Sequence, residues 1–163
     1  MEFIKKSKNA GFSKILWAFV AIMLCALPCK ALDLDIETEV TVPSTENPGP
    51  YNTVNVLSGG TLNLESGGII SGDVFALNVS NVNITGGDVS GWINVGPSAN
   101  VTVSGTDFSV TNGAMNSSGT FFTPNQYAQC LLEGTYGGGA GSISLTFYTI
   151  NTGVQINLGS PSQ

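Results

Sequence analysis

The chain has 163 residues, of which eleven are acidic and five are lysine, with no arginine and no histidine, and its formal net charge is −6. All five lysines lie in the first thirty positions, and Glu2 is the only acid there, so residues 32–163 carry ten acidic side chains and no base. This composition excludes serine or cysteine nucleophiles that depend on a histidine or lysine base. It also disfavours nucleic acids and anionic membrane surfaces as partners, because nothing would neutralise their phosphates.

Residues 1–31 have the organisation of a secretory signal peptide. Lysines precede an apolar run, Ile15–Leu27, which is shorter than the roughly 20 residues that a membrane span needs. The residues that follow fit a signal-peptidase site, and we predict cleavage after Ala31 and export of the remaining chain. Two alternatives stay open, a lipoprotein modified at Cys25 or Cys29 and an uncleaved anchor.

Residues 32–50 are predicted to form an N-terminal acidic strand and a linker. Over 32–42 apolar residues alternate with acidic ones, which indicates one strand with a buried face and an acidic face. The segment Pro43–Pro50 then breaks the pattern. The carboxylates would repel a second copy at this end of the molecule; they are Asp33, Asp35, Glu37 and Glu39.

From residue 54 onward the sequence repeats with a period of roughly 19. The pair Gly67-Gly68 recurs one period later as Gly86-Gly87. Short alternating strands recur from Leu62 to Val82 to Val101, the first step being one residue longer than the second. Such a period predicts a single parallel β-solenoid over residues 51–113. The segment Val54–Val56 resembles a further strand but does not keep the period. The alternative is an antiparallel β-sandwich, which needs no fixed period.

Glycines mark the corners of the predicted coils. We expect them to adopt positive φ or to allow close approach of neighbouring backbones; they are Gly67, Gly68, Gly72, Gly86, Gly87, Gly91 and Gly105.

Residues 114–163 depart from the repeat and are predicted to form a β-rich cap over the last coil. We expect residues 114–129 to be irregular, followed by strands over 131–136 and 142–150 and a last strand that holds Val154, Ile156 and Leu158. The one thiol after residue 31, Cys130, lies in an apolar setting and is predicted to be buried and inert. Pairing with a cysteine of another molecule is the alternative.

The segment Val54–Phe108, with its recurring Gly-Gly corners, resembles the Gly-Gly β-helical repeats of secreted bacterial proteins, many of which carry a C-terminal Pro-Glu-Pro exosortase sorting tail. The segments Leu132–Tyr136 and Val154–Leu158 are similar to the terminal module of those proteins. The resemblance implies a secreted β-solenoid and no defined activity, since those proteins are mostly uncharacterised. Only Gly-Ser-Pro-Ser-Gln follows Leu158, so sorting through such a tail is not expected.

Two aspartates are candidates for a calcium site. Asp88 and Asp107 are one repeat apart, and if they occupied the same corner their carboxylates would repel unless a cation bridged them. The alternative is that both are solvated turn residues. No other cofactor is expected.

Two aromatic residues are candidates for sugar stacking. Phe75 and Trp92 adjoin inward positions, so alternation should point both side chains outward, where they would stack on sugars or pack under a loop.

The sequence predicts an exported, non-catalytic β-solenoid with a structural or interaction role at the cell surface or in the extracellular matrix. Its partner would be an extracellular protein or polysaccharide, with no membrane association after signal cleavage. A carbohydrate-binding module is the alternative. A glycoside hydrolase with a carboxylate pair is a further one, for which the solenoid supplies Glu65, Asp73, Asp88 and Asp107.

Overall fold

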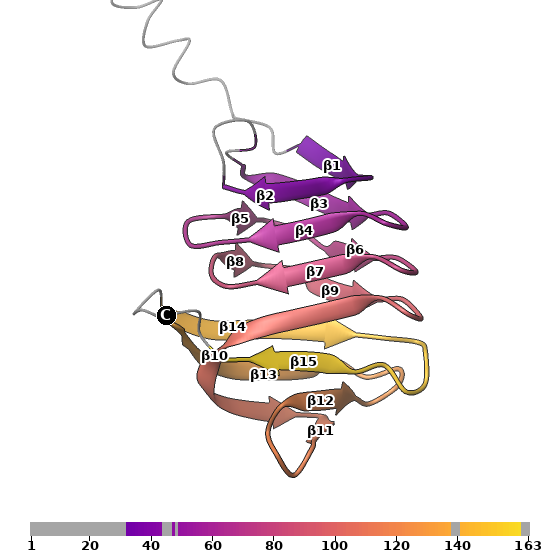
Figure 1. The fold of residues 1–163 in the computed structure, drawn as a ribbon, viewed down its shortest axis with the longest axis vertical. Coiled ribbons are helices and arrows are strands. Elements are labelled where there is room, and N and C mark those ends of the chain that lie inside the picture. Colours follow the sequence, from indigo (N-terminus) through magenta and orange to yellow (C-terminus); the bar gives the residue numbers. More distant parts are fainter. Residues whose placement is uncertain (1–31, 44–46, 48, 138–140, 161–163) are drawn as a thin grey trace, which may run out of the picture. The chain divides into compact units, whose positions relative to one another are not determined.

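The protein is an all-β solenoid whose coils stack along one axis (Figure 1). The structure is a computed structural model that describes residues 32–43, 47, 49–137 and 141–160. The predicted signal peptide and its cleavage point at Ala31 lie outside these residues. Within them, no helix is long and apolar enough to cross a membrane.

One side of each coil contributes a strand to a parallel stack that we call sheet A. Because each strand pairs in register with the strand of the next coil, equivalent side chains form columns that run along the solenoid axis. From the N-terminal coil onward, sheet A contains β1 (Leu32–Ile36), β3 (Tyr51–Val56), β6 (Val74–Ala76), β9 (Trp92–Val95) and β14 (Ser142–Tyr148).

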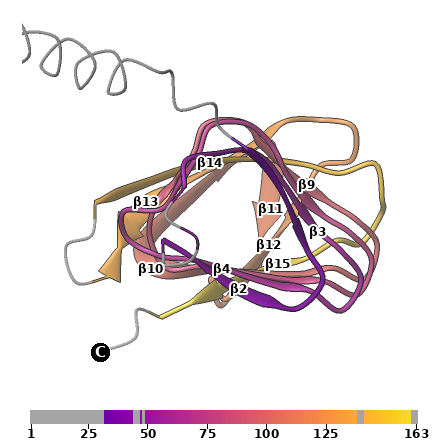
Figure 2. The same ribbon diagram turned by 90° about the horizontal axis from the view of Figure 1, so that it is seen from above.

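A second side of the coils forms another parallel stack, sheet B. It contains β2 (Glu39–Val42), β4 (Thr61–Leu64), β7 (Asn81–Ile84), the first part of β10 (Asn100–Thr111) and β15 (Ile156–Gly159). The short strands β5 (Ile69–Ile70) and β8 (Asp88–Val89) pair with each other on the remaining side. Seen along the axis, the successive coils superpose around a common core (Figure 2).

The register confirms the predicted repeat. Leu62 pairs with Val82, and Val82 pairs with Val101, so each strand lies over the equivalent strand of the next repeat. The interpretation of Val54–Val56 as out of period is wrong, because Val54 pairs with Val74 at the same spacing as Leu62 with Val82. The step from Val82 to Val101 is one residue shorter, and the corners absorb this difference without disturbing the strands.

The solenoid begins earlier than the sequence indicated. Residues 32–42 form two strands rather than one, separated by a bend at Glu37-Thr38, and these strands pair in parallel with β3 and β4. They are therefore a first coil, and the predicted domain boundary at residue 51 falls inside the stack. The apolar alternation continues through the bend, since Ile36 before it and Val42 after it are both buried, whereas Leu32 at the start of the coil is 67% exposed.

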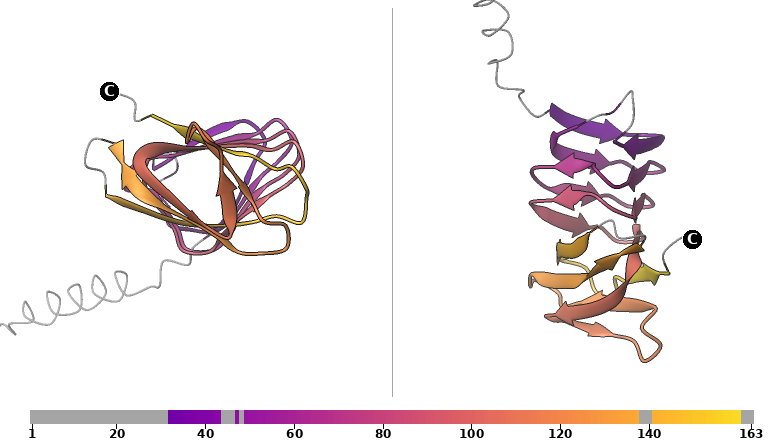
Figure 3. Two further views of the ribbon diagram at one scale, coloured as in Figure 1. Left: turned by 90° about the horizontal axis from the view of Figure 1, so that it is seen from below. Right: turned by 90° about the vertical axis from the view of Figure 1, so that its left-hand side faces the viewer.

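The C-terminal segment combines a cap with a last coil. After β10 the chain forms β11 (Gly113–Met115) and β12 (Phe121–Pro124), an antiparallel pair in the region that was predicted to be irregular. Strand β13 (Cys130–Tyr136) then runs antiparallel to both β10 and β14. Strands β14 and β15 return to the stack in parallel with β9 and β10, and these C-terminal strands lie at the end remote from β1 (Figure 3).

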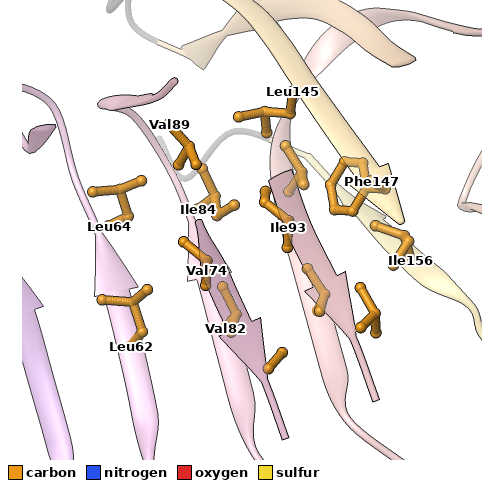
Figure 4. Packing of buried hydrophobic residues seen from close by; sticks show 14 of the residues in the cluster. Leu62, Leu64, Val74, Val82, Ile84, Val89, Ile93, Leu145, Phe147 and Ile156 are labelled. Atoms are coloured by element: carbon orange, nitrogen blue, oxygen red, sulfur yellow. The ribbon is translucent and has the colours of Figure 1, made fainter. Parts of the chain in front are cut away.

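The core consists of columns of branched apolar side chains. Leu62 and Leu64 lie over Val82 and Ile84, and Val74 lies over Ile93 (Figure 4). The last coil adds larger groups, and the rings of Phe122 and Phe147 pack edge to face with their centroids 5.4 Å apart. No single coil could bury its apolar face, so the coils depend on one another for stability.

The corner glycines act as predicted, in the two ways expected of them. Gly67 and Gly87 have φ angles of +89° and +82°, a conformation that disfavours any residue with a Cβ. At the other predicted positions a Cβ would collide with neighbouring backbone or side-chain atoms; these are Gly68, Gly72, Gly86, Gly91 and Gly105.

The outer face of sheet B carries a ladder of asparagine amides. The amide of Asn83 donates to Asn63, 2.9 Å away, and the amide of Asn63 donates to Glu39, 2.8 Å away. A second ladder runs through Thr61, Asn81, Asn100 and Asn157. These contacts satisfy polar groups between adjacent coils and hold the coils in register.

Truncating a core column should destabilise the protein far more than truncating an exposed residue of the same type. We predict that Ile93→Ala lowers the free energy of unfolding by about 2–5 kcal/mol, because Ile93 is fully buried. Ile69→Ala is the matched control, since Ile69 is 46% exposed in β5. Chemical denaturation measures both variants, and equal losses would contradict the assignment of Ile93 to the core.

Candidate functional site

A groove of about 320 Å³ lies where three neighbouring strands of sheet A end. It is lined by three short segments that occupy equivalent places in three stacked coils, each made of the end of a strand and the residues that follow it: 75–78 at the end of β6, 94–97 at the end of β9 and 148–151 at the end of β14. Because these segments lie on consecutive strands of one sheet, the groove runs across the strands and along the solenoid axis.

One side of the groove is a column of two aromatic rings with an amide between them. Phe75 pairs with Asn94, and Asn94 pairs with Tyr148, so all three lie in one register column. All three side chains are half-buried and point outward, because the neighbours Ala76, Val95 and Phe147 point into the core. The two rings are therefore separated by two strand spacings, roughly 10 Å.

Trp92 extends this aromatic surface sideways. Its ring centroid lies 5.7 Å from that of Tyr148 at an interplanar angle of 31°, and the side chain is 41% exposed. The backbone NH of Trp92 donates to Asp73 at 2.7 Å, which fixes the start of β9. Phe75 and Trp92 thus lie outward, as the sequence predicted.

Tyr148, which packs against Trp92 and shares a register column with Phe75, is not identified by the sequence analysis. It belongs to β14, which follows the cap segment and not the repeat. Its alternation with Phe147 indicates an outward position, but nothing in the sequence indicates that β14 would pair with β9.

The amide of Asn94 is not used by the fold. Among the described residues it makes no side-chain hydrogen bond, whereas Asn55 donates to Asp35 at 2.7 Å in the same column. The difference arises because Phe75 and Tyr148 replace the polar neighbours that an asparagine ladder needs. Asn94 therefore presents a donor and an acceptor to the groove between two aromatic rings.

The turn after β14 also lines the groove and is hydrogen-bonded to the end of β9. The hydroxyl of Thr149 is buried and donates to the carbonyl of Val95 at 3.0 Å, and the backbone NH of Asn151 donates back to that hydroxyl at 3.0 Å. In the middle coil Gly96 contributes to the lining, and a Cβ at this position would lie 2.9 Å from the carbonyl oxygen of Ala76. None of the residues that line the groove is charged.

The two aspartates of the calcium hypothesis do not occupy equivalent positions. Asp88 pairs with Ile69 of β5, while Asp107 lies in the bulge of β10 where that strand pairs with β13. The premise that they share a corner is therefore wrong. Among the described residues no three Asp, Glu or Cys side chains are grouped to hold a metal.

The other carboxylates lie apart from the groove or take part in the fold. Glu65 follows β4 at a corner, and Asp73 is hydrogen-bonded to the backbone of Trp92. The acidic residues of the first coil are exposed, as predicted, and Asp33, Asp35 and Glu39 accept hydrogen bonds from asparagines of the next coil. Glu39 is thereby the terminal acceptor of the ladder that runs through Asn63 and Asn83.

Cys130 is free and buried at the start of β13, which confirms the burial predicted from the sequence. Burial raises the pKa of this thiol to about 11. In the same strand, burial and the charge of Asp88 raise the pKa of Tyr136 to about 12, and its hydroxyl has no hydrogen-bond partner within the described residues.

Comparison of the chain with protein-family models, with curated proteins and with solved structures found no match in any of the three. The site is therefore interpreted from its own geometry.

The two raised pKa values predict a loss of stability at alkaline pH. The ordinary pKa values are 9.0 for Cys130 and 10.0 for Tyr136, so in both cases the folded state keeps a proton that the unfolded state loses. This contribution is complete below pH 9 and is lost as the pH rises toward 12. Denaturation of wild type and of Cys130→Ala/Tyr136→Phe across this range should show a smaller loss in the variant. The same loss in both proteins would contradict the assignment.

Proposed function

We propose that the protein is an exported, non-catalytic β-solenoid that binds carbohydrate through the groove on sheet A. The observation that carries the proposal is the column Phe75–Asn94–Tyr148, extended by Trp92. Partly exposed aromatic rings offer flat apolar surface to the faces of sugar rings, and an uncommitted amide beside them can hydrogen-bond the hydroxyls at the sugar edge.

A binding role fits this surface better than a catalytic one. Hydrolysis of a glycosidic bond needs two carboxyl groups on either side of that bond, and the groove lining contains none. The chain after residue 30 also lacks the histidine, lysine and arginine that other polysaccharide-cleaving chemistry would use. We therefore assign recognition, not turnover, to this surface.

Export and a place at the cell surface or in the extracellular matrix complete the proposal. They are supported by the lysine-rich start of the chain with its short apolar run, and by the resemblance of residues 54–158 to secreted Gly-Gly repeat proteins. A rigid solenoid with a lateral groove suits such a place, because its sheets present fixed columns of side chains to an extended polymer.

Truncation of the aromatic side chains should weaken sugar binding without unfolding the protein. A glycan array identifies the ligand, and calorimetric titration then compares wild type with Trp92→Ala and Tyr148→Ala. We expect the affinity to fall tenfold or more, which corresponds to about 1.4 kcal/mol. Met115→Ala is the control, because Met115 is exposed to a similar degree, 37% against 41% for Trp92, and lies in β11.

The proposed function is wrong if the array detects no glycan, or if Met115→Ala weakens binding as much as the aromatic variants do. Thermal denaturation of each variant establishes that the fold is retained.

A further inference from the structure

We infer that the ligand is a linear, uncharged, β-1,4-linked polysaccharide that lies along the solenoid axis and spans three coils. The inference rests on the proposed function and adds to it the linkage, charge and direction of the bound chain. It follows from the direction of the groove, the spacing of its aromatic rings and the absence of charge in its lining.

The direction follows from the construction of the groove. Its lining comes from equivalent segments of three stacked coils, at residues 75–78, 94–97 and 148–151. A ligand that fills it must cross strands β6, β9 and β14, and therefore must be extended over at least two strand spacings, roughly 10 Å. A single sugar ring would contact only part of this surface.

The linkage follows from the positions of the rings. Phe75 and Tyr148 lie in the same column, two strands apart, on one face of sheet A. An extended β-1,4-linked chain advances by a little more than one strand spacing per sugar and turns each sugar by about half a turn. The first and third sugars thus present the same face, so one would stack on Phe75 and the other on Tyr148. An α-1,4-linked glucan is curved, so it could not stack on the rings of Phe75 and Tyr148 at the same time.

The amide in the middle of the column fits the intervening sugar. Asn94 lies between the two rings and makes no side-chain hydrogen bond among the described residues. The second sugar of a β-1,4-linked trisaccharide is turned relative to its neighbours and would place an edge with hydroxyls over this position. An amide can both donate to and accept from such hydroxyls, because it carries an NH₂ and a carbonyl oxygen.

The absence of charge excludes acidic polymers. No residue that lines the groove is charged, and residues 32–163 contain ten acidic side chains with no base. A polyuronate would meet no cation at the site and would be repelled by the field of the whole protein. The bound polymer is therefore neutral.

The test is a length series of soluble oligosaccharides titrated against the purified protein. The probes are β-1,4-linked gluco-, xylo- and manno-oligosaccharides of two to six sugars, with malto-oligosaccharides for the α linkage and β-1,4-linked mannuronate oligomers for the charge. We expect at least one neutral β-linked series to bind, with a tenfold or greater gain in affinity between two and four sugars. The malto- and mannuronate series should bind at least tenfold more weakly.

Phe75→Ala distinguishes a ligand that spans three coils from one held at Tyr148 and Trp92 alone. This variant should lose the increase in affinity between two and four sugars. Its affinity for the disaccharide should stay within about twofold of wild type, since a disaccharide can bind at the end of the groove that holds Tyr148. Asn94→Ala should weaken the tetrasaccharide and again change the disaccharide less. Met115→Ala should change neither.

The outcomes separate the inference from the proposed function. Suppose that a glycan binds and that its binding depends on Trp92. If its affinity does not increase with the number of sugars, or if α-linked or anionic chains bind more tightly, the inference is wrong and the proposed function stands. If no carbohydrate of any kind binds, both are wrong.

Discussion

The in-register parallel pairing of successive coils is the constraint on which this protein depends. Each coil satisfies its backbone groups and buries its apolar residues only against the coils beside it. The same pairing places equivalent outward side chains of successive coils one strand spacing apart, so the surface consists of columns of side chains along the axis. What a column does is then decided by the residues that occupy it, because the backbone is nearly the same in each coil.

The two sheets illustrate this rule with opposite results. On sheet B asparagines follow one another in the columns, and amides such as those of Asn63 and Asn83 bond to one another across the coils. The ladder through Asn83 and Asn63 ends at the first coil on the carboxylate of Glu39, which accepts a hydrogen bond and would repel another copy. On sheet A the aromatic residues Phe75 and Tyr148 interrupt the column and leave Asn94 without an internal partner among the described residues. The amides on sheet B are used in hydrogen bonds between coils, whereas the amide of Asn94 on sheet A is available to bind a ligand.

The sequence is sufficient to predict the solenoid, its core columns and its corner glycines, because a local period determines them. It is insufficient where the period changes. The first coil has no Gly-Gly corner, and the step from Glu39 to its partner Thr61 is longer than in the regular coils, so the sequence indicates only a strand and linker there.

The same limit applies to the candidate site. Tyr148 escapes sequence analysis because the whole cap segment separates it in the chain from its partner Asn94, and β14 returns to the stack only after that cap. Asp88 and Asp107 keep the period in sequence, but β10 leaves the coil between them, so their spacing is misleading.

The central claim is that three stacked coils form one continuous binding surface on sheet A. It is tested most directly by nuclear magnetic resonance, in which the labelled protein is titrated with the oligosaccharide that binds most tightly. The account predicts that the shifted amide signals cluster in residues 75–78, 94–97 and 148–151, with the indole signal of Trp92 among them, and that sheet B is unchanged. Shifts confined to one coil, or centred on the asparagine ladders of sheet B, would contradict it.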